Sequence, residues 1–219
     1  MKQFNDNNLD AYKRRPVQLP VAFEGFPFIG FVLLLALMFW YLSAIYLALP
    51  FFVLAISIAL FFRNPPRRFP RGEMILLSPA DGRVISAGEN GDFNLVSIFM
   101  SVANVHINRM PCAGTVTDVA YNKGKFHIAH CDKASLDNEQ NCIEFKDQMG
   151  RNYKMIQIAG YVARRIVCYF KGTENFKQGE RAGLIRFGSR VDLYMPKEIV
   201  VTVKVGDKVR GGETIVGRM

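Results

Sequence analysis

The feature that most constrains this chain is an unbroken run of uncharged residues at positions 25–62. As one straight helix this run would be about 57 Å long, whereas a bilayer core is about 30 Å thick and takes about 20 residues. The run is too long for one crossing and suits two tightly connected ones. Tyr41, Ser43 and Tyr46 lie near its middle, and Pro50 follows. This pattern predicts a helical hairpin whose tip reaches the far interface.

Both flanks of the run are basic: Lys13, Arg14 and Arg15 precede it, and Arg63, Arg67, Arg68 and Arg71 follow it. The positive-inside rule therefore places both ends in the cytoplasm, at the cell membrane. The run is too long for a secretory signal, and no small-residue cleavage site follows it. The alternative is a buried helical pair in a soluble protein. A run without charge has no polar face to meet water, which favours the membrane.

The net charge of the chain is +9, and the isoelectric point is about 9.5. Nucleic acid is one possible partner for a basic chain. However, the basic stripe interleaved with aromatic residues that such readers use is not evident. Arginines beside an apolar anchor more simply face anionic lipid headgroups. We therefore expect a membrane partner and no nucleic acid.

Metal-binding patterns are weak. The cysteines form no CxxC pair, and we expect them to be reduced and buried as small apolar side chains. His127 and His130 have a spacing that could bind a metal on a helix, but their stretch favours strand or loop and no carboxylates complete a site. We therefore expect no metal. The cysteines are Cys112, Cys131, Cys142 and Cys168.

The texture of the sequence divides the chain into four parts. We expect a polar leader at 1–24, the membrane hairpin at 25–62, a proline- and arginine-rich linker at 63–72 and a catalytic domain at 73–219. In the last part, short β-rich runs alternate with Gly, Asp and Asn every 8 to 12 residues or so, which predicts a mainly β sandwich or barrel with some helix, an α+β domain. The stretch "ARRIVCYF" fits either a short helix or a strand.

Two segments of this domain share a cadence: "SPADGRVISAG" and "VKVGDKVRGGETIVG". The second resembles the hairpin of biotinyl and lipoyl carrier domains, which are flattened β sandwiches. A carrier needs an exposed lysine in a Met-Lys turn, and no such pair stands in a turn here. The cadence therefore indicates lipoyl-like architecture rather than carrier chemistry. A membrane-tethered binding module without catalysis is one functional alternative.

Three residues could form a catalytic constellation. His106 stands in "SVANVHINRMPCAG" beside Asn104, Asn108 and Arg109, a dense polar group next to an apolar run that needs a reason to be buried. Asp81 suits the start of an Asp-Gly turn, but a carboxylate can also orient an imidazole that deprotonates a serine. Ser189 is the serine that follows a glycine between two arginines. A serine hydrolase using these three residues is a second alternative.

The Gly188-Ser189 pair has a chemistry of its own. A serine hydroxyl can attack the preceding carbonyl, and a glycine at that carbonyl gives little steric hindrance and tolerates strain. A base must remove the proton, and donors must stabilise the oxyanion. The ester opens by β-elimination, and hydrolysis of the dehydroalanine leaves a pyruvoyl group. Such a ketone, made by the protein itself, can act as an electron sink for an amine substrate.

Several motifs then point to one family. "FFRNPPR", "SPADGRV", "NVHINRMPCAG", "DKASLDNEQN", "RFGSRVDLYMP" and "VKVGDKVRGGETI" follow one another in an order that resembles phosphatidylserine decarboxylase proenzymes, most closely the short bacterial and archaeal type. The resemblance covers nearly all of 60–219, and the apolar hairpin fits as well. "RFGSR" alone would be a weak signal, but six ordered motifs are specific.

The resemblance implies a self-cleaving enzyme. The chain would be cut between Gly188 and Ser189 into a β chain, 1–188, and an α chain, 189–219, that stay together as a heterodimer. Ser189 would become the pyruvoyl cofactor, and phosphatidylserine would lose carbon dioxide to give phosphatidylethanolamine. The resemblance therefore implies a role in phospholipid biosynthesis at the membrane. The acyl-chain preference and any higher oligomer are not determined by the sequence.

The resemblance also assigns roles to single residues. His106 matches the family's motif histidine and is the candidate acid or base, while Asp81 matches the aspartate of the charge relay for self-cleavage. Longer relatives carry a second histidine directly before "MPC", where this chain has Arg109, so the base for self-cleavage stays open. Arg109, Arg186 and Arg190 are candidate ligands for the phosphate or carboxylate of the headgroup, since a guanidinium binds either group bidentately.

Overall fold

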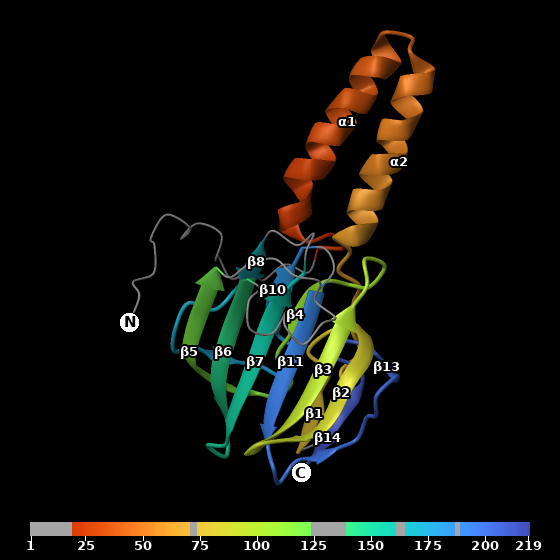
Figure 1. Cartoon of the computed structure of the whole chain (residues 1–219). Coiled ribbons are helices and arrows are strands. Elements are labelled where there is room, and N and C mark those ends of the chain that lie inside the picture. The colour runs from red at the N-terminus through yellow and green to blue at the C-terminus, as the bar shows by residue number, and fades with distance from the viewer. Residues whose placement is uncertain (1–18, 71–73, 124–138, 161–164, 187–188) are drawn as a thin grey trace. The chain divides into compact units, whose positions relative to one another are not determined.

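The computed structural model of the chain describes residues 19–70, 74–123, 139–160, 165–186 and 189–219. It separates into two compact units, and the chain passes from one unit to the other between Pro66 and Arg67. The first unit is a helical hairpin and the second is a mainly β domain (Figure 1). The predicted fold class, a mainly β domain preceded by an N-terminal apolar helical hairpin, is confirmed. The unit boundary lies inside the stretch predicted as a linker.

The hairpin consists of a short 3-10 turn, η2 (Phe23–Gly25), followed by helices α1 (Phe26–Tyr41) and α2 (Ile45–Phe61). Pro27 stands in the first turn of α1, where its missing N–H leaves no intrahelical bond unmade. The chain reverses between the helices, where Ser43 has a positive φ of 57°. Pro50 lies inside α2. Leucine, alanine and phenylalanine, with no charge between them, supply the rest of both helices.

Small side chains lie at the contact between the two helices. Ala36, Ala48 and Ala55 are buried, and the rings of Phe39 and Phe51 stack with centroids 5.4 Å apart. Many of the large apolar side chains point outward and are exposed. The segment Phe23–Tyr41 is long and apolar enough to cross a bilayer, and α2 is shorter. The outward side chains include Leu34, Leu37, Trp40, Leu49, Val53, Ile56 and Leu60.

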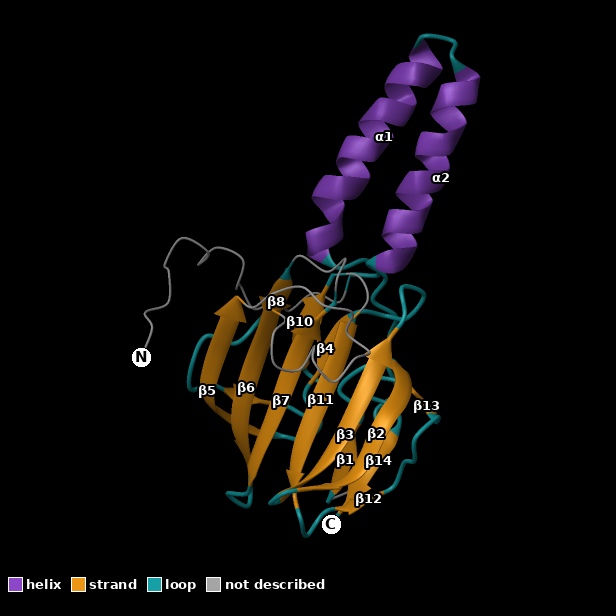
Figure 2. Ribbon diagram, in the orientation of Figure 1, coloured by secondary structure: helices purple, strands orange, loops and turns teal. Residues whose placement is uncertain are grey.

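The β domain is built on one large antiparallel sheet (Figure 2). In the described residues this sheet contains eight strands. Their spatial order is β13 (Lys208–Val209), β2 (Gly82–Asn90), β3 (Phe93–Met100), β11 (Ser189–Pro196), β7 (Asn152–Ala159), β6 (Glu139–Asp147), β5 (Gly114–Lys123) and β9 (Asn175–Phe176).

Two three-stranded sheets complete the domain. One has the order β1 (Ile75–Leu77), β14 (Ile215–Arg218) and β12 (Val200–Val201), and the other has the order β4 (Ile107–Arg109), β10 (Arg181–Ile185) and β8 (Ile166–Cys168). The stretch that fitted either a helix or a strand thus contains a strand. One cluster of buried apolar side chains joins all three sheets, among them Leu76, Val216, Ala182, Ile98, Val191 and Met155.

Strand β11 lies in the middle of the large sheet because its sequence is apolar at every second position. Val191, Leu193 and Met195 are completely buried on the core side, as expected for side chains that alternate along a strand. The strand pairs with β3 from Ser189↔Met100 to Pro196↔Phe93, and with β7 from Ser189↔Ala159 to Tyr194↔Lys154. Both of its edges are therefore hydrogen-bonded.

The two segments that share a cadence are direct neighbours. β13 pairs with the start of β2, so that Val209 lies opposite Gly82. Gly206 and Gly212 flank β13 and have φ values of +98° and +78°, which glycine adopts without strain. The two segments with the shared cadence are thus joined by antiparallel pairing of β13 with β2.

We predict that Gly114→Ala destabilises the β domain. A Cβ at this position would lie 2.0 Å from the backbone oxygen of Lys146 on β6, so the strands would have to separate. The expected loss is about 1–3 kcal/mol in the free energy of unfolding, measured by chemical denaturation of the full chain in detergent. Gly172→Ala is the control because no atom lies within 4 Å of its added Cβ. Equal stability of the two variants would contradict the packing described for Gly114.

Candidate active site

Ser189 is the first residue of β11, and it is completely buried. Its hydroxyl donates a hydrogen bond to the Sδ atom of Met100, 3.4 Å away. A thioether is a weak acceptor, so the hydroxyl has a partner that holds it loosely. Gly188, the other half of the predicted cleavage site, lies outside the described residues.

His106 precedes β4 and is also buried. Its Nδ1 lies 2.9 Å from the backbone oxygen of Asn104. A carbonyl oxygen can only accept, so Nδ1 carries the hydrogen of this contact. The Asn104 side chain closes the turn by accepting from both the N–H and the hydroxyl of Ser101. The backbone oxygen of His106 accepts from the N–H of Ile185, the last residue of β10.

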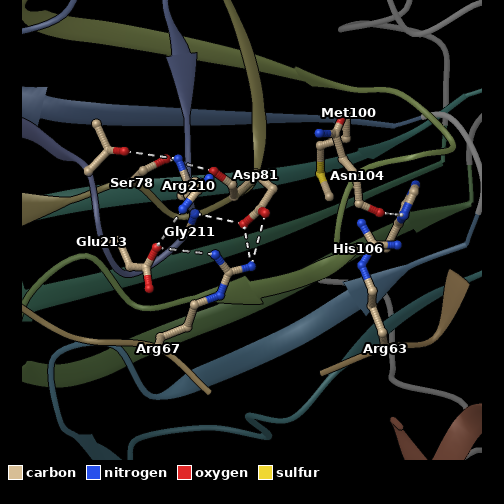
Figure 3. A network of polar contacts seen from close by, with 12 residues as sticks. Arg63, Arg67, Ser78, Asp81, Met100, Asn104, His106, Arg210, Gly211 and Glu213 are labelled. Atoms are coloured by element: carbon tan, nitrogen blue, oxygen red, sulfur yellow. Dashed lines mark hydrogen bonds and ion pairs between the residues drawn. The ribbon is translucent and has the colours of Figure 1, made fainter. Parts of the chain in front are cut away.

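Asp81 has a different set of partners. Nη2 of Arg67 lies 2.9 Å from each carboxylate oxygen, and the backbone N–H of Gly211 donates to Oδ1 at 2.8 Å. Arg67 also forms an ion pair with Glu213 at 3.6 Å. Figure 3 shows the contacts of Asp81 and those of His106 as two separate groups. The Asp81 carboxylate is therefore bound by Arg67, and the His106 imidazole is bound by a backbone carbonyl. These contacts do not form a Ser-His-Asp triad.

Arg109 belongs to the surroundings of Asp81. It is buried, and its Nη1 donates to the backbone oxygen of Gly179 at 2.9 Å. Its Cζ lies 5.7 Å from the ring centre of Phe69. Burial lowers the pKa of the Arg109 guanidinium to about 10, and repulsion from Arg67 acts in the same direction. At neutral pH the side chain is nevertheless charged.

The other two candidate arginines lie elsewhere. Arg190 donates through Nε and Nη2 to the two carboxylate oxygens of Asp192, at 2.8 and 2.6 Å. Since neighbours in a strand point to opposite faces, Arg190 extends from the face of β11 opposite to Ser189. Arg186 follows β10, and its backbone N–H donates to the oxygen of Arg165 at 3.2 Å. The three arginines thus have three different surroundings.

A chain of buried amides reaches the Met100 sulfur that Ser189 contacts, and of its members the sequence analysis singles out only Asn108, as a neighbour of His106. Asn141 donates to Gln157 at 2.9 Å, and Gln157 donates to Asn108 at 2.8 Å. Asn108 donates to the same Met100 sulfur that Ser189 contacts, at 3.6 Å. The available signal was a single amide in each of two apolar, strand-like stretches, "NCIEF" and "MIQIA".

Within the described residues, no group of three or more His, Cys, Asp or Glu side chains is arranged to hold a metal. His127, His130 and Cys131 lie outside those residues. The other three cysteines are free. Burial raises the pKa of Cys112 to about 12 and that of Cys168 to about 11, so neither is a thiolate nucleophile at neutral pH.

Fold and site together define a mainly β domain that buries Ser189 and His106, which is an enzyme-like arrangement rather than the exposed lysine turn of a carrier. Residues 54–217 match the family model described as "Phosphatidylserine decarboxylase". The chain belongs to this family.

Curated relatives agree with the family match. The chain is 45% identical over 215 residues to the phosphatidylserine decarboxylase proenzyme of Citrifermentans bemidjiense, which covers 93% of this chain and 98% of that protein. Proenzymes with the same name from Syntrophus aciditrophicus and Desulfotalea psychrophila are 44% and 42% identical, over 90% and 92% of this chain and 96% and 98% of those proteins. The resemblance predicted from the ordered motifs is confirmed.

We predict that Arg67→Gln destabilises the domain strongly, because it leaves the Asp81 carboxylate without its cation. The two side chains are 6% and 13% exposed, and breaking a buried pair on one side costs about 3–5 kcal/mol. Lys154→Gln is the control: it breaks a 2.9 Å pair with Glu144 whose side chains are 42% and 45% exposed, a change of about 1 kcal/mol or less. Chemical denaturation measures both.

The double variant Arg67→Gln, Asp81→Asn should recover part of the loss, because it removes the orphaned charge as well as the cation. A double variant that is as unstable as the sum of the two single variants would contradict a direct coupling between these side chains.

Proposed function

We propose that this chain is a membrane-bound phosphatidylserine decarboxylase, made as a proenzyme that cuts itself between Gly188 and Ser189. It converts phosphatidylserine to phosphatidylethanolamine and carbon dioxide. The observation that carries the proposal is the position of Ser189. Inside a family match that spans 54–217, this serine is buried and is the first residue of a central strand. The serine hydrolase alternative lacks its triad, and the binding-module alternative is not supported by the family.

The cutting step follows from the chemistry of a serine after glycine. A base takes the hydroxyl proton of Ser189, and Oγ attacks the carbonyl carbon of Gly188. The new C–O bond replaces the peptide C–N bond, and the freed nitrogen takes up a proton. Loss of the Ser189 Cα proton then breaks the Cβ–O bond and releases the end of the β chain as a carboxylate. Water adds to the dehydroalanine and ammonia leaves, so that residue 189 carries a pyruvoyl group.

The pairing of β11 supports an α chain that stays in place after the cut. This strand is hydrogen-bonded to β3 and β7 of the β chain on its two edges. Further along the α chain, β13 pairs with β2 and β14 pairs with β1. The α chain also places Val191, Leu193 and Val216 in the common core. The product is therefore a heterodimer held by sheet and core contacts.

The surroundings of residue 189 suit a pyruvoyl group. The Nδ2 donor of Asn108 and the Ser189 hydroxyl point to the same sulfur, so a donor is available for a carbonyl oxygen at this place. A pyruvoyl ketone at residue 189 would supply an electron sink for the electron pair left when carbon dioxide departs from an amine substrate. Asn104 engages Nδ1 of His106, so a proton transfer by this residue would use Nε2. We propose His106 as the acid that protonates the substrate carbon and as a base for cutting.

The remaining candidates take different roles in this proposal. Asp81 would have to release Arg67 to act as a relay for His106, so its contacts favour a positioning role at the turn beside Gly211. Arg186 is the preferred headgroup ligand, because it follows the strand whose last N–H bonds His106. The fork of Arg190 is used by Asp192.

The helical hairpin fits a substrate whose acyl chains stay in the membrane. An anchored enzyme can meet the headgroup at the interface without extracting the lipid. The apolar segment Phe23–Tyr41 is long enough to cross, and the basic flanks at Arg14 and Arg67 favour the cytoplasmic side for the β domain. We propose the cell membrane as the location and anionic lipid as the surface.

We predict that the purified wild-type chain is largely cut and that Ser189→Ala is not. A denaturing gel should show a fragment of 31 residues, and mass spectrometry should find a pyruvoyl group rather than serine at its start. The two fragments should elute together under native conditions. Ser97→Ala is the control, because Ser97 is a buried serine of the neighbouring strand β3. An uncut wild-type chain, or carbon dioxide release by Ser189→Ala, would contradict the proposal.

We predict that His106→Ala loses decarboxylation by about 10²–10⁴-fold, the contribution typical of a positioned acid or base. The release of labelled carbon dioxide is compared for equal amounts of cut protein, so that slower cutting is not mistaken for slower decarboxylation. If both reactions use Nε2, both should fall, and added imidazole should restore part of each. Cut protein with wild-type decarboxylation would remove His106 from the mechanism.

A further inference from the structure

We infer that the buried amides of Asn141, Gln157 and Asn108 form a fixed chain of donors that ends at residue 189. Asn108 would donate to the oxygen of the carbonyl that Ser189 attacks during cutting, and to the ketone oxygen of residue 189 afterwards. Asn108 is then a catalytic residue, and Gln157 and Asn141 are positioning residues that act through it. The inference rests on the proposed function and names the donor that this function requires.

The direction of the chain follows from its contacts. Asn141 Nδ2 donates to Gln157 Oε1 at 2.9 Å, and Gln157 Nε2 donates to Asn108 Oδ1 at 2.8 Å. Because Oδ1 of Asn108 is held by Gln157, its Nδ2 faces the other way, toward Met100 Sδ at 3.6 Å. Each amide thus fixes the orientation of the next one.

The location of the chain is selective. Asn141 and Gln157 stand on the core face of the large sheet in β6 and β7, and Gln157 lies opposite Val191 of β11. The next core positions along the same two strands, Ile143 and Met155, are apolar and completely buried. Amides therefore replace apolar side chains near the end of the sheet where β11 begins.

Stability alone does not require these amides. A buried polar group lowers stability unless it is hydrogen-bonded, and apolar groups of the same shape can replace a bonded pair at little cost. Asn108 and Gln157 are completely buried and Asn141 is nearly so. A bonded chain of polar side chains in an apolar core therefore calls for a role beyond packing.

The sulfur of Met100 indicates what that role is. Two donors, Asn108 Nδ2 and Ser189 Oγ, are directed at one thioether, which is a weak acceptor. During cutting, the carbonyl oxygen of the attacked peptide gains negative charge, and after cutting residue 189 carries a ketone oxygen that can only accept. In either state Asn108 gains a stronger acceptor than sulfur. The donor is thus in place before the negative charge or the ketone forms, which is the condition for electrostatic preorganisation.

The test compares Asn108→Asp with Asn94→Asp in the full chain. Asp at 108 keeps an oxygen for Gln157 but removes the Nδ2 donor. Asn94 is a buried asparagine on the same face of β3 as Met100, at the other end of the strand, where it donates to the backbone oxygens of Lys197 and Ile199. We expect Asn108→Asp to slow cutting by about 10²–10³-fold, the effect of removing one oxyanion donor. Asn94→Asp should cut at the wild-type rate.

A second readout separates a donor from a structural residue. Among molecules that are cut, Asn108→Asp should lower kcat for decarboxylation with little change in KM, and the ketone should react more slowly with hydroxylamine. Both values are normalised to the pyruvoyl content found by mass spectrometry. Gln157→Glu, which keeps the acceptor for Asn141 and loses the donor to Asn108, should move the same readouts in the same direction by a smaller factor.

The outcomes are distinct. An uncut wild-type chain would overturn the proposed function itself. A wild-type chain that is cut, with Asn108→Asp cutting and decarboxylating within about twofold of it, would overturn this inference alone. If Asn108→Asp does not fold, Gln157→Glu decides: wild-type rates and wild-type hydroxylamine reactivity in that variant would overturn the inference.

Discussion

The insertion of β11 between β3 and β7 is the constraint on which the rest of the domain depends. Hydrogen bonds on both edges leave the strand one register, since a shift by one residue would turn Val191 and Leu193 out of the core. That register sets Ser189 opposite Met100 and Ala159, and therefore decides which side chains surround it. The strand is apolar enough to be central, and its first residue is nevertheless a serine. The proposed cleavage site thus adjoins a strand that is paired on both edges.

The polar groups around Asp81 and His106 have different partners. The Asp81 group balances charge: one carboxylate is held by Arg67 and the N–H of Gly211, and Glu213 shares the same arginine. In the His106 group, the imidazole is oriented by the backbone oxygen of Asn104. A carbonyl fixes the tautomer without adding a negative charge next to the reacting bond. The proposed proton transfer by His106 would therefore not depend on Asp81 or on a second histidine at position 109.

A structural feature could be predicted from the sequence when the residues that form it are close together along the chain. The apolar hairpin, the glycine turns around β13 and the serine after glycine were predictable, because each is a pattern over neighbouring residues. The direction of Arg190 was also within reach, since a buried Ser189 forces its neighbour to the opposite face. The amide chain was not predictable, because Asn108, Gln157 and Asn141 meet only through the pairing of separate strands and the packing of β4. The pairing of Asp81 with Arg67 was missed because the arginine lies in a stretch interpreted as a linker.

The pairing of the last strands has a consequence for how the protein folds. β14 joins β1 near the start of the domain, and the N–H of Met219 bonds the oxygen of Met74. In the uncut chain, all these contacts form within one molecule, at a high effective concentration. If the chain is cut after Gly188 as proposed, the same contacts would join two molecules, and refolding would become a second-order reaction that slows with dilution. The fold would then be acquired once, as a precursor, and the cut protein would depend on slow unfolding rather than on repeated refolding.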